Sequence, residues 1–93
     1  MIRSFSNKDT ESIFNGERSH RFPPEIQNTA RRKLRIIAAA TTVEDLRIPP
    51  GNRLEKLSGN LAGYYSIRIN DQWRIVFKFE DKGADDVRIE NYH

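Results

Sequence analysis

The second half of the chain alternates between hydrophobic and polar residues at every second position. The alternation runs through segments 64–70, 73–80 and 87–90, with turn-forming residues at 70–72 and 81–86 between them. Because successive side chains of a strand point to opposite faces, this pattern predicts an antiparallel meander with one buried face. The residues expected on the buried face are Tyr65, Ile67, Ile69, Trp73, Ile75, Phe77, Phe79, Val87 and Ile89.

The first half of the chain is predicted to supply helices. A short strand at 1–6 precedes a helix that Asp9 or Thr10 caps and that ends near Phe14, before Gly16. A longer helix begins at the prolines 23–24, which suit a first turn, and continues to about residue 40. A third, short helix starts at a Thr42 cap with Asp45 in a capping box, and a loop at 49–52 follows it. One apolar stripe runs along the longer helix, at spacings of four and three: Ile26, Ala30, Leu34 and Ile37.

These elements predict an α+β fold, with the helices packed on one face of a twisted antiparallel sheet. A fourth strand is expected at 54–57, although its apolar residues lie three apart. The length of 93 residues predicts one domain over 1–93. The other sheet face is expected to be open. It would carry the cations Arg68, Arg74, Lys78 and Arg88, together with Ser66, Asn70, Glu90 and Tyr64.

The composition excludes several kinds of chemistry. The chain has no Cys, and its two His, at 20 and 93, have no metal-ligand spacing, so no metal site is predicted. It has no glycine-rich phosphate-binding motif, so no cofactor is expected. No apolar run approaches the roughly 20 residues of a membrane helix, and the N-terminus lacks the apolar core of a signal peptide. We therefore expect a cytoplasmic protein without a membrane partner.

The cations favour a phosphate-rich partner. Eleven of the sixteen Lys and Arg residues are Arg, which suits bidentate contact with phosphate. The predicted open face can track an RNA backbone, while its aromatic rings stack on bases. The alternative is a solvated sheet face with cross-strand ion pairs. The cationic run at 31–35 is either a solvated helix face or a docking surface for an acidic partner.

RNA cleavage needs neither metal nor cofactor, because the substrate's 2′-hydroxyl is the nucleophile. The protein must supply a base, an acid and cations that stabilise the charge on phosphorus. Residues able to fill those roles are Glu55, Arg74, Tyr92 and His93. Arg53 and Lys56, beside Glu55, can bind phosphate. The alternatives are a charged edge strand around Glu55 and an exposed tail at His93.

Three sequence strings identify a family resemblance. They are Arg53-Leu54-Glu55-x-Leu57-x-Gly59, then Gly63-Tyr64-Tyr65-Ser66-Ile67-Arg68-Ile69-Asn70-x-Gln72-Trp73-Arg74-Ile75, then the closing Asn91-Tyr92-His93. Together with Met1-Ile2-Arg3-Ser4-Phe5 and Pro49-Pro50-Gly51-Asn52, they resemble the HigB-like host-inhibition toxins of the RelE/ParE toxin–antitoxin superfamily.

The resemblance implies helices packed on a twisted antiparallel sheet and an mRNA endoribonuclease that works in the ribosomal A site. It also implies a HigA-like helix-turn-helix antitoxin as partner. The family's catalytic positions fall on Arg74, Tyr92 and His93. Glu55 and Ser58 stand where relatives often carry His and Lys, and the acidic residue before the closing Tyr-His is here Asn91. Asn70 replaces a strand arginine of some members.

Two other functions are compatible with the same scaffold. ParE-type relatives bind DNA gyrase, so a non-enzymatic gyrase inhibitor is one alternative. The other is a module that binds RNA or the ribosome without cleavage. The terminal Tyr-His favours the nuclease.

Overall fold

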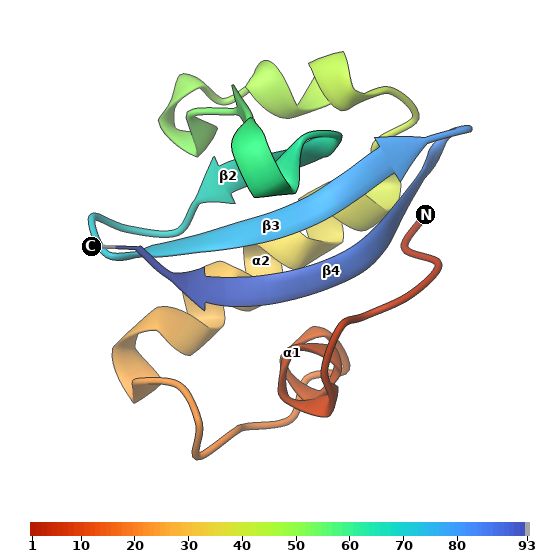
Figure 1. Ribbon diagram of the computed structural model, residues 1–93. Helices are drawn as coiled ribbons and strands as arrows, with labels where there is room; N and C mark the ends of the chain where they lie inside the picture. Colours follow the sequence, from red (N-terminus) through yellow and green to blue (C-terminus); the bar gives the residue numbers. More distant parts are fainter. Residues whose placement is uncertain (93) are drawn as a thin grey trace.

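A computed structural model describes residues 1–92 of the chain. The predicted α+β fold is confirmed: the main helix lies behind a four-stranded antiparallel sheet, as Figure 1 shows. The strands follow one another in space as they do in sequence, in the order β1-β2-β3-β4. The helices are α1 (Lys8–Phe14) and α2 (Pro24–Ala39). The strands are β1 (Glu55–Lys56), β2 (Tyr64–Arg68), β3 (Trp73–Glu80) and β4 (Gly83–Asn91).

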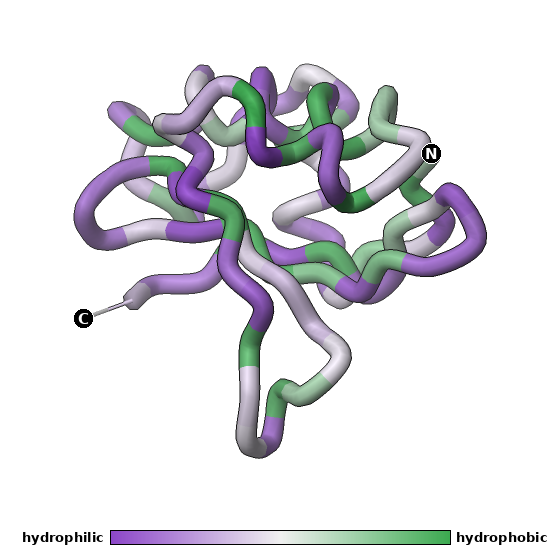
Figure 2. The backbone as a smooth tube through the Cα atoms, turned by 90° about the horizontal axis from the view of Figure 1, so that it is seen from above, coloured by the Kyte–Doolittle hydropathy of each residue, from purple (hydrophilic) through white to green (hydrophobic). Residues whose placement is uncertain are grey.

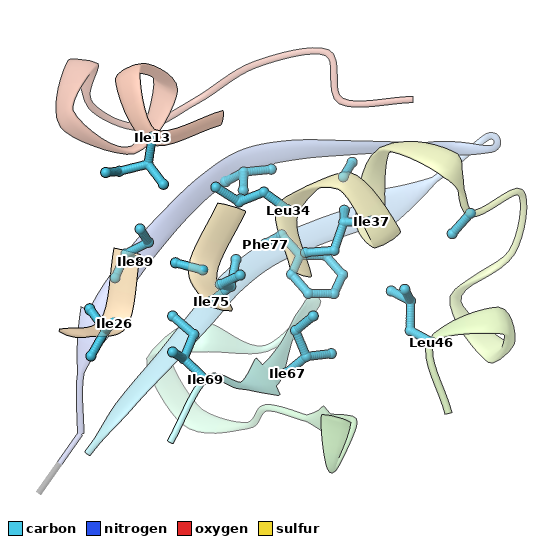
Figure 3. Packing of buried hydrophobic residues seen from close by; sticks show 14 of the residues in the cluster. Ile13, Ile26, Leu34, Ile37, Leu46, Ile67, Ile69, Ile75, Phe77 and Ile89 are labelled. Carbon is cyan, nitrogen blue, oxygen red and sulfur yellow. The ribbon is translucent and has the colours of Figure 1, made fainter. Parts of the chain in front are cut away.

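The core lies between α2 and one face of the sheet (Figure 3). All four residues of the predicted helix stripe are buried there. Ile67 of β2 is opposite Ile75 of β3, which is opposite Ile89 of β4, so three neighbouring strands present isoleucines to the helix. Each of the nine residues predicted on the covered sheet face belongs to this core or packs against it. Fully burying side chains of this kind stabilises a fold by about 1.5–3 kcal/mol each.

The chain before α1 runs alongside β4 without forming a regular strand. Two isolated parallel bridges, Ile2 to Ala84 and Phe5 to Val87, are all that remains of the strand expected at 1–6. The cap of α1 also differs from the prediction, because Asn7 accepts the N–H of Thr10 at 2.8 Å. An Asn at this position caps a helix as well as Asp does, and because it lies two residues before Asp9, α1 begins at Lys8.

The turn between β3 and β4 is shorter than the expected 81–86. It has only two central residues, Asp81 and Lys82, with φ of 52° and 66°. Two successive positive φ angles produce a tight hairpin whose twist matches the strands. A bulge opposite Val76–Lys78 then takes up an extra residue in β4, where Asp86 has φ 53°.

The segment between α2 and β1 consists of two short 3-10 helices, η1 (Val43–Arg47) and η2 (Pro50–Asn52). The predicted capping box of η1 is present, since the Asp45 carboxylate accepts the backbone N–H groups of Thr41 and Thr42. A third 3-10 helix, η3 (Gly59–Leu61), connects β1 to β2. Among residues 1–92, no helix has the length and apolar character that a bilayer crossing requires.

Candidate active site

The sheet face opposite α2 is not fully open, contrary to the sequence prediction. Ser66 and Val76 are completely buried there, and Arg74 is only 8% exposed. Figure 1 shows η3 in front of the sheet, on the side away from α2, and the Arg53 carbonyl, at the end of η2, contacts Arg74. The partial cover leaves a hollow at one end of this face.

Arg74 is the central residue of this hollow. Its Nε donates to the Ser66 hydroxyl at 2.8 Å, and its Nη2 donates to the Arg53 carbonyl at 2.6 Å. These bonds hold the guanidinium plane in one orientation. Its Nη1 faces the Glu55 carboxylate, with 3.6 Å between Nη1 and Oε1. The Arg74 side chain is 10% exposed and that of Glu55 is 58% exposed, so the pair joins a buried cation to a solvent-facing acid.

The loop before β1 supplies the carbonyl that Arg74 contacts. Arg53 has left-handed backbone angles, φ 45° and ψ 57°, at the end of η2. The buried Asn52 side chain fixes this loop by donating to the carbonyls of Leu46, at 3.1 Å, and Ile48, at 3.4 Å. The Arg53 carbonyl is therefore set by loop geometry, while its exposed side chain lines the hollow.

Tyr92 closes another side of the hollow. The regular strand β4 ends at Asn91, and the Tyr92 backbone N–H donates to the carbonyl of Gln72 in the β2–β3 turn. Arg74 Cζ lies 6.0 Å from the Tyr92 ring centroid, at the outer limit of a cation–π contact. Figure 2 shows that the β1–β2 connection and the end of β4 project on the same side of the molecule. His93, the proposed acid or base, lies outside the described residues.

The hollow has a volume of about 450 Å³. Its lining residues are Arg53, Glu55, Arg68, Asn70, Asp71, Arg74 and Tyr92. Three arginines thus converge from the loop before β1, from β2 and from β3. Arg68 is paired with Asp71, and Arg74 with Glu55. The arginines outnumber the two acids, so the hollow suits a phosphate group that displaces one of the carboxylates.

Two other predicted RNA-binding residues lie apart from this hollow. Lys78 Nζ and Arg88 Cζ lie 5.1 Å and 5.2 Å from the ring centroid of Tyr64, on the same side of the sheet as Arg74. The Tyr64 hydroxyl donates to Asp86 at 3.1 Å. These residues form a second cationic group around an aromatic ring.

Lys56 belongs to neither group. It is opposite Tyr65 in the ladder, whereas Glu55 is opposite Ser66, so the two side chains leave opposite faces of β1. The predicted site residues therefore separate into the hollow, the Tyr64 group and Lys56.

Sequence reasoning missed two contributors to the hollow. Asp71 was expected only as a turn residue, although its position three residues after Arg68 is a usable signal for an ion pair. The Arg53 backbone carbonyl had no such signal, because nothing in its side chain predicts left-handed angles.

Lys33 also differs from expectation. It is 6% exposed, so it does not share the solvated helix face assigned to the run at 31–35. Burial lowers the pKa of the Lys33 ammonium group, and neighbouring cations lower this pKa further. Those cations are Arg32, Arg68 and Arg74. Two of these cations, Arg68 and Arg74, also line the hollow.

Among residues 1–92, no three His, Cys, Asp or Glu side chains gather into a group able to hold a metal ion. The chemistry that the described residues of the hollow offer is that of guanidinium groups, two carboxylates and a phenol. They suit the binding of a phosphodiester and the movement of a proton beside it.

Comparisons with solved structures place this geometry on a known scaffold. YafQ from E. coli superposes with a TM-score of 0.64 at 15% identity, over 98% of this chain and 93% of that chain. YoeB in the YoeB–YefM toxin–antitoxin complex from Staphylococcus aureus superposes with a TM-score of 0.61 at 23% identity, over 100% and 98%. These similarities concern the fold.

Sequence comparisons give the family. Toxin HigB-1 of Vibrio cholerae is 46% identical over 82 residues, which are 87% of this chain and 86% of that protein. Endoribonuclease HigB of Proteus vulgaris is 30% identical over the full length of both chains. The family model described as RelE-like toxin of type II toxin–antitoxin system HigB matches residues 3–93. The chain therefore belongs to the HigB-like toxins, the RelE-like toxins of type II toxin–antitoxin systems.

Proposed function

We propose that this toxin is an endoribonuclease that cuts mRNA on the ribosome, with the hollow around Arg74 as its active site. The observation that carries the proposal is the fixed Arg74 guanidinium, which presents Nη1 to a cavity that Glu55 and Tyr92 also line. The name of its Proteus vulgaris relative, Endoribonuclease HigB, supports the same activity.

The reaction needs only groups of the chain and of the RNA. A base takes the proton of the 2′-hydroxyl, and the 2′-oxygen forms a bond to phosphorus. The bond from phosphorus to the 5′-oxygen then breaks, and an acid protonates that oxygen. The products are a 2′,3′-cyclic phosphate and a free 5′-hydroxyl. Charge accumulates on the non-bridging oxygens in the transition state, where a preorganised guanidinium stabilises it most.

Position in the hollow supports a role for Glu55 in proton transfer. Glu55 is the base, because its carboxylate lies beside Arg74 and is open to solvent. His93 is the acid or base that complements Glu55, and Tyr92 stacks on an mRNA base or assists proton transfer. Relatives often carry a lysine at the position of Ser58. Ser58 is exposed and does not line the hollow, so it does not replace the function of that lysine.

RNA binding extends beyond the hollow. Arg53 and Arg68 hold phosphates near the scissile one, and Lys78 and Arg88 hold the backbone where it passes Tyr64. Lys56 contacts RNA or ribosome from the outer side of β1. The hollow is shallow, so the ribosomal A site positions the message, and free toxin cuts poorly.

The remaining assignments follow from the family. We propose a HigA-like helix-turn-helix antitoxin as partner, a cytoplasmic location and a single toxin domain over 1–93. Binding of this antitoxin would end cleavage of mRNA on the ribosome by the toxin.

The test is cleavage of a translated message by the wild type, by Arg74→Ala and by a chain that lacks His93. Loss of a charge-stabilising group costs about 2.7–4 kcal/mol of transition-state stabilisation, a fall of about 10²–10³ in rate. Arg47→Ala is the matched control, since Arg47 is exposed, pairs only with Glu44 and lies outside the hollow. Unchanged cleavage by both site variants would reject the site. DNA damage with intact mRNA would instead identify a gyrase inhibitor.

A further inference from the structure

The outer side of α2 carries a feature that RNA cleavage does not use. A hollow of about 550 Å³ runs along it, lined by Asn28, Arg31, Arg32, Arg35, Ile36 and Ala39. These positions follow one another at spacings of three and one, so they form one continuous stripe on the helix. We call this set the α2 stripe. It lies on the side of α2 away from Ile26, Ala30, Leu34 and Ile37, and at its border Ile36 also packs partly against the core.

The α2 stripe combines an apolar floor with cations. Ala39 is exposed and Ile36 is partly exposed, and the aliphatic stems of the arginines extend this apolar surface. Arg32 and Arg35 are exposed. Within residues 1–92, no carboxylate lies within ion-pair distance of either.

Arg31 has a different role within the α2 stripe. Its Nε donates to the Ile13 carbonyl at 2.8 Å, and its Nη2 donates to the Glu17 carbonyl at 3.1 Å. These bonds attach the end of α1 and the following loop to α2. Arg31 thus forms a fixed wall of the stripe, while Arg32 and Arg35 remain available to a partner.

The chemistry of the α2 stripe matches a protein segment better than RNA. Single-stranded nucleic acid sites combine cations with aromatic rings on which bases stack. The α2 stripe has no aromatic residue, whereas the sheet face has Tyr64 and Tyr92 beside its cations. An apolar groove edged by arginines is complementary to a helix that has one apolar face and acidic residues beside it.

We propose that the α2 stripe binds an acidic amphipathic helix of the antitoxin. No residue of the stripe lines the Arg74 hollow, and the stripe and the hollow lie on opposite sides of the sheet. The antitoxin therefore holds the toxin by a surface separate from the active site. This inference rests on the assignment of the chain as a toxin with an antitoxin, and it does not depend on the cleavage chemistry.

The experiment measures the Kd of the full toxin for its purified full-length antitoxin, by calorimetry at low and high salt. The double charge reversal Arg32→Glu with Arg35→Glu is expected to weaken binding on the order of tenfold or more at low salt, with less effect at high salt. The control reverses Lys8 and Arg18, two exposed cations outside the stripe, and changes the net charge equally. Its Kd is expected to stay within about twofold of the wild type.

A second variant, Arg32→Ala with Arg35→Ala, keeps good helix formers at exposed positions if the reversal does not fold. It should weaken binding in the same direction. An unchanged Kd in the folded variants would overturn the proposal, as would loss of ribosomal cleavage without loss of antitoxin binding. Failure of the wild type to cut mRNA would reject the proposed function and leave this binding result intact.

Discussion

The Nε of Arg74 donates to the hydroxyl of Ser66 at 2.8 Å, between two side chains that the fold almost completely buries. A buried guanidinium needs acceptors for its N–H groups, and here they come from one hydroxyl and from backbone carbonyls. None of these acceptors carries a charge. The positive charge of Arg74 is therefore not neutralised by a buried carboxylate, and it faces the hollow.

Ser66→Ala tests whether this hydroxyl positions Arg74. The change leaves Nε without its acceptor, which we expect to cost about 1–3 kcal/mol of unfolding free energy. We also expect kcat for ribosomal cleavage to fall about tenfold with little change in KM, since a loosened guanidinium loses transition-state contacts first. Ser58→Ala, at an exposed position, is the control. Ser66→Thr keeps the acceptor and should recover kcat at temperatures where it is folded. Equal kcat in wild type and Ser66→Ala would remove Ser66 from the positioning role.

Glu55→Gln tests the proposed base. The amide keeps the size of the carboxylate but cannot accept the proton, so we expect the cleavage rate to fall about 10²–10⁴-fold. Single-turnover cleavage of a translated message at one fixed pH measures this fall. Glu44→Gln, with the same change in charge outside the hollow, should behave as the wild type. Cleavage by Glu55→Gln at the wild-type rate would assign the base to another group.

The elements that the sequence predicted well are those whose residues repeat with a period. The predictions for the strand positions from Tyr65 to Ile89 and for the buried helix positions from Ile26 to Ile37 were correct, because each side of the core selects hydrophobic residues at its own spacing. A turn was predicted at 81–86, but its tight form at Asp81-Lys82 was not, because positive φ angles usually attract Asn and Gly. The extra residue at the bulge of β4 interrupts the alternation, so the strand was predicted to begin at 87, whereas β4 begins at Gly83.

The sequence indicated which region of the second sheet face is covered, but not which segment covers it. Val76 is an apolar residue among the polar positions of β3, and its complete burial shows that it marked the covered region. The loop that supplies the cover has no periodic pattern, so its path depends on long-range packing. For that reason, the sequence identified the arginine at the centre of the site but not the carbonyl at Arg53 that orients it.

Asp85→Asn tests the attachment of the N-terminal segment to β4. Hydrogen bonds from Arg3 hold the pKa of the Asp85 carboxyl below its ordinary value, and the attraction of the Arg3 charge acts in the same direction. A carboxyl whose pKa is lower in the folded state stabilises the fold above its unfolded pKa, and that stabilisation disappears as the pH falls through the folded pKa. Denaturant unfolding should therefore show a larger loss in Asp85→Asn at pH 7 than at a pH below the folded-state pKa of Asp85. Glu17→Gln, in an exposed loop, should show no such difference. A pH-independent loss in Asp85→Asn would mean that the ion pair contributes nothing.

Lys33→Met tests how far the potential of the active site reaches. The Lys33 ammonium group has a lowered pKa because it is buried on α2 and is repelled by cations that include Arg68 and Arg74. A lysine with a lowered folded-state pKa destabilises the fold while it is charged, and this penalty decreases only as the pH rises through that pKa. Met fills a similar volume without charge, so Lys33→Met should raise the unfolding free energy at pH 7, and this gain in stability should shrink at alkaline pH.

Repulsion from Arg74 contributes part of the penalty on charged Lys33. The gain in unfolding free energy from Lys33→Met should therefore be smaller in an Arg74→Ala background than in the wild type. Denaturant unfolding of the single and double variants measures this difference as a double-mutant cycle. Lys8→Met, at an exposed position of α1, should give no gain in either background. Destabilisation by Lys33→Met at pH 7 would show that the ammonium group has a favourable partner and would reject this coupling between α2 and the arginines of the site.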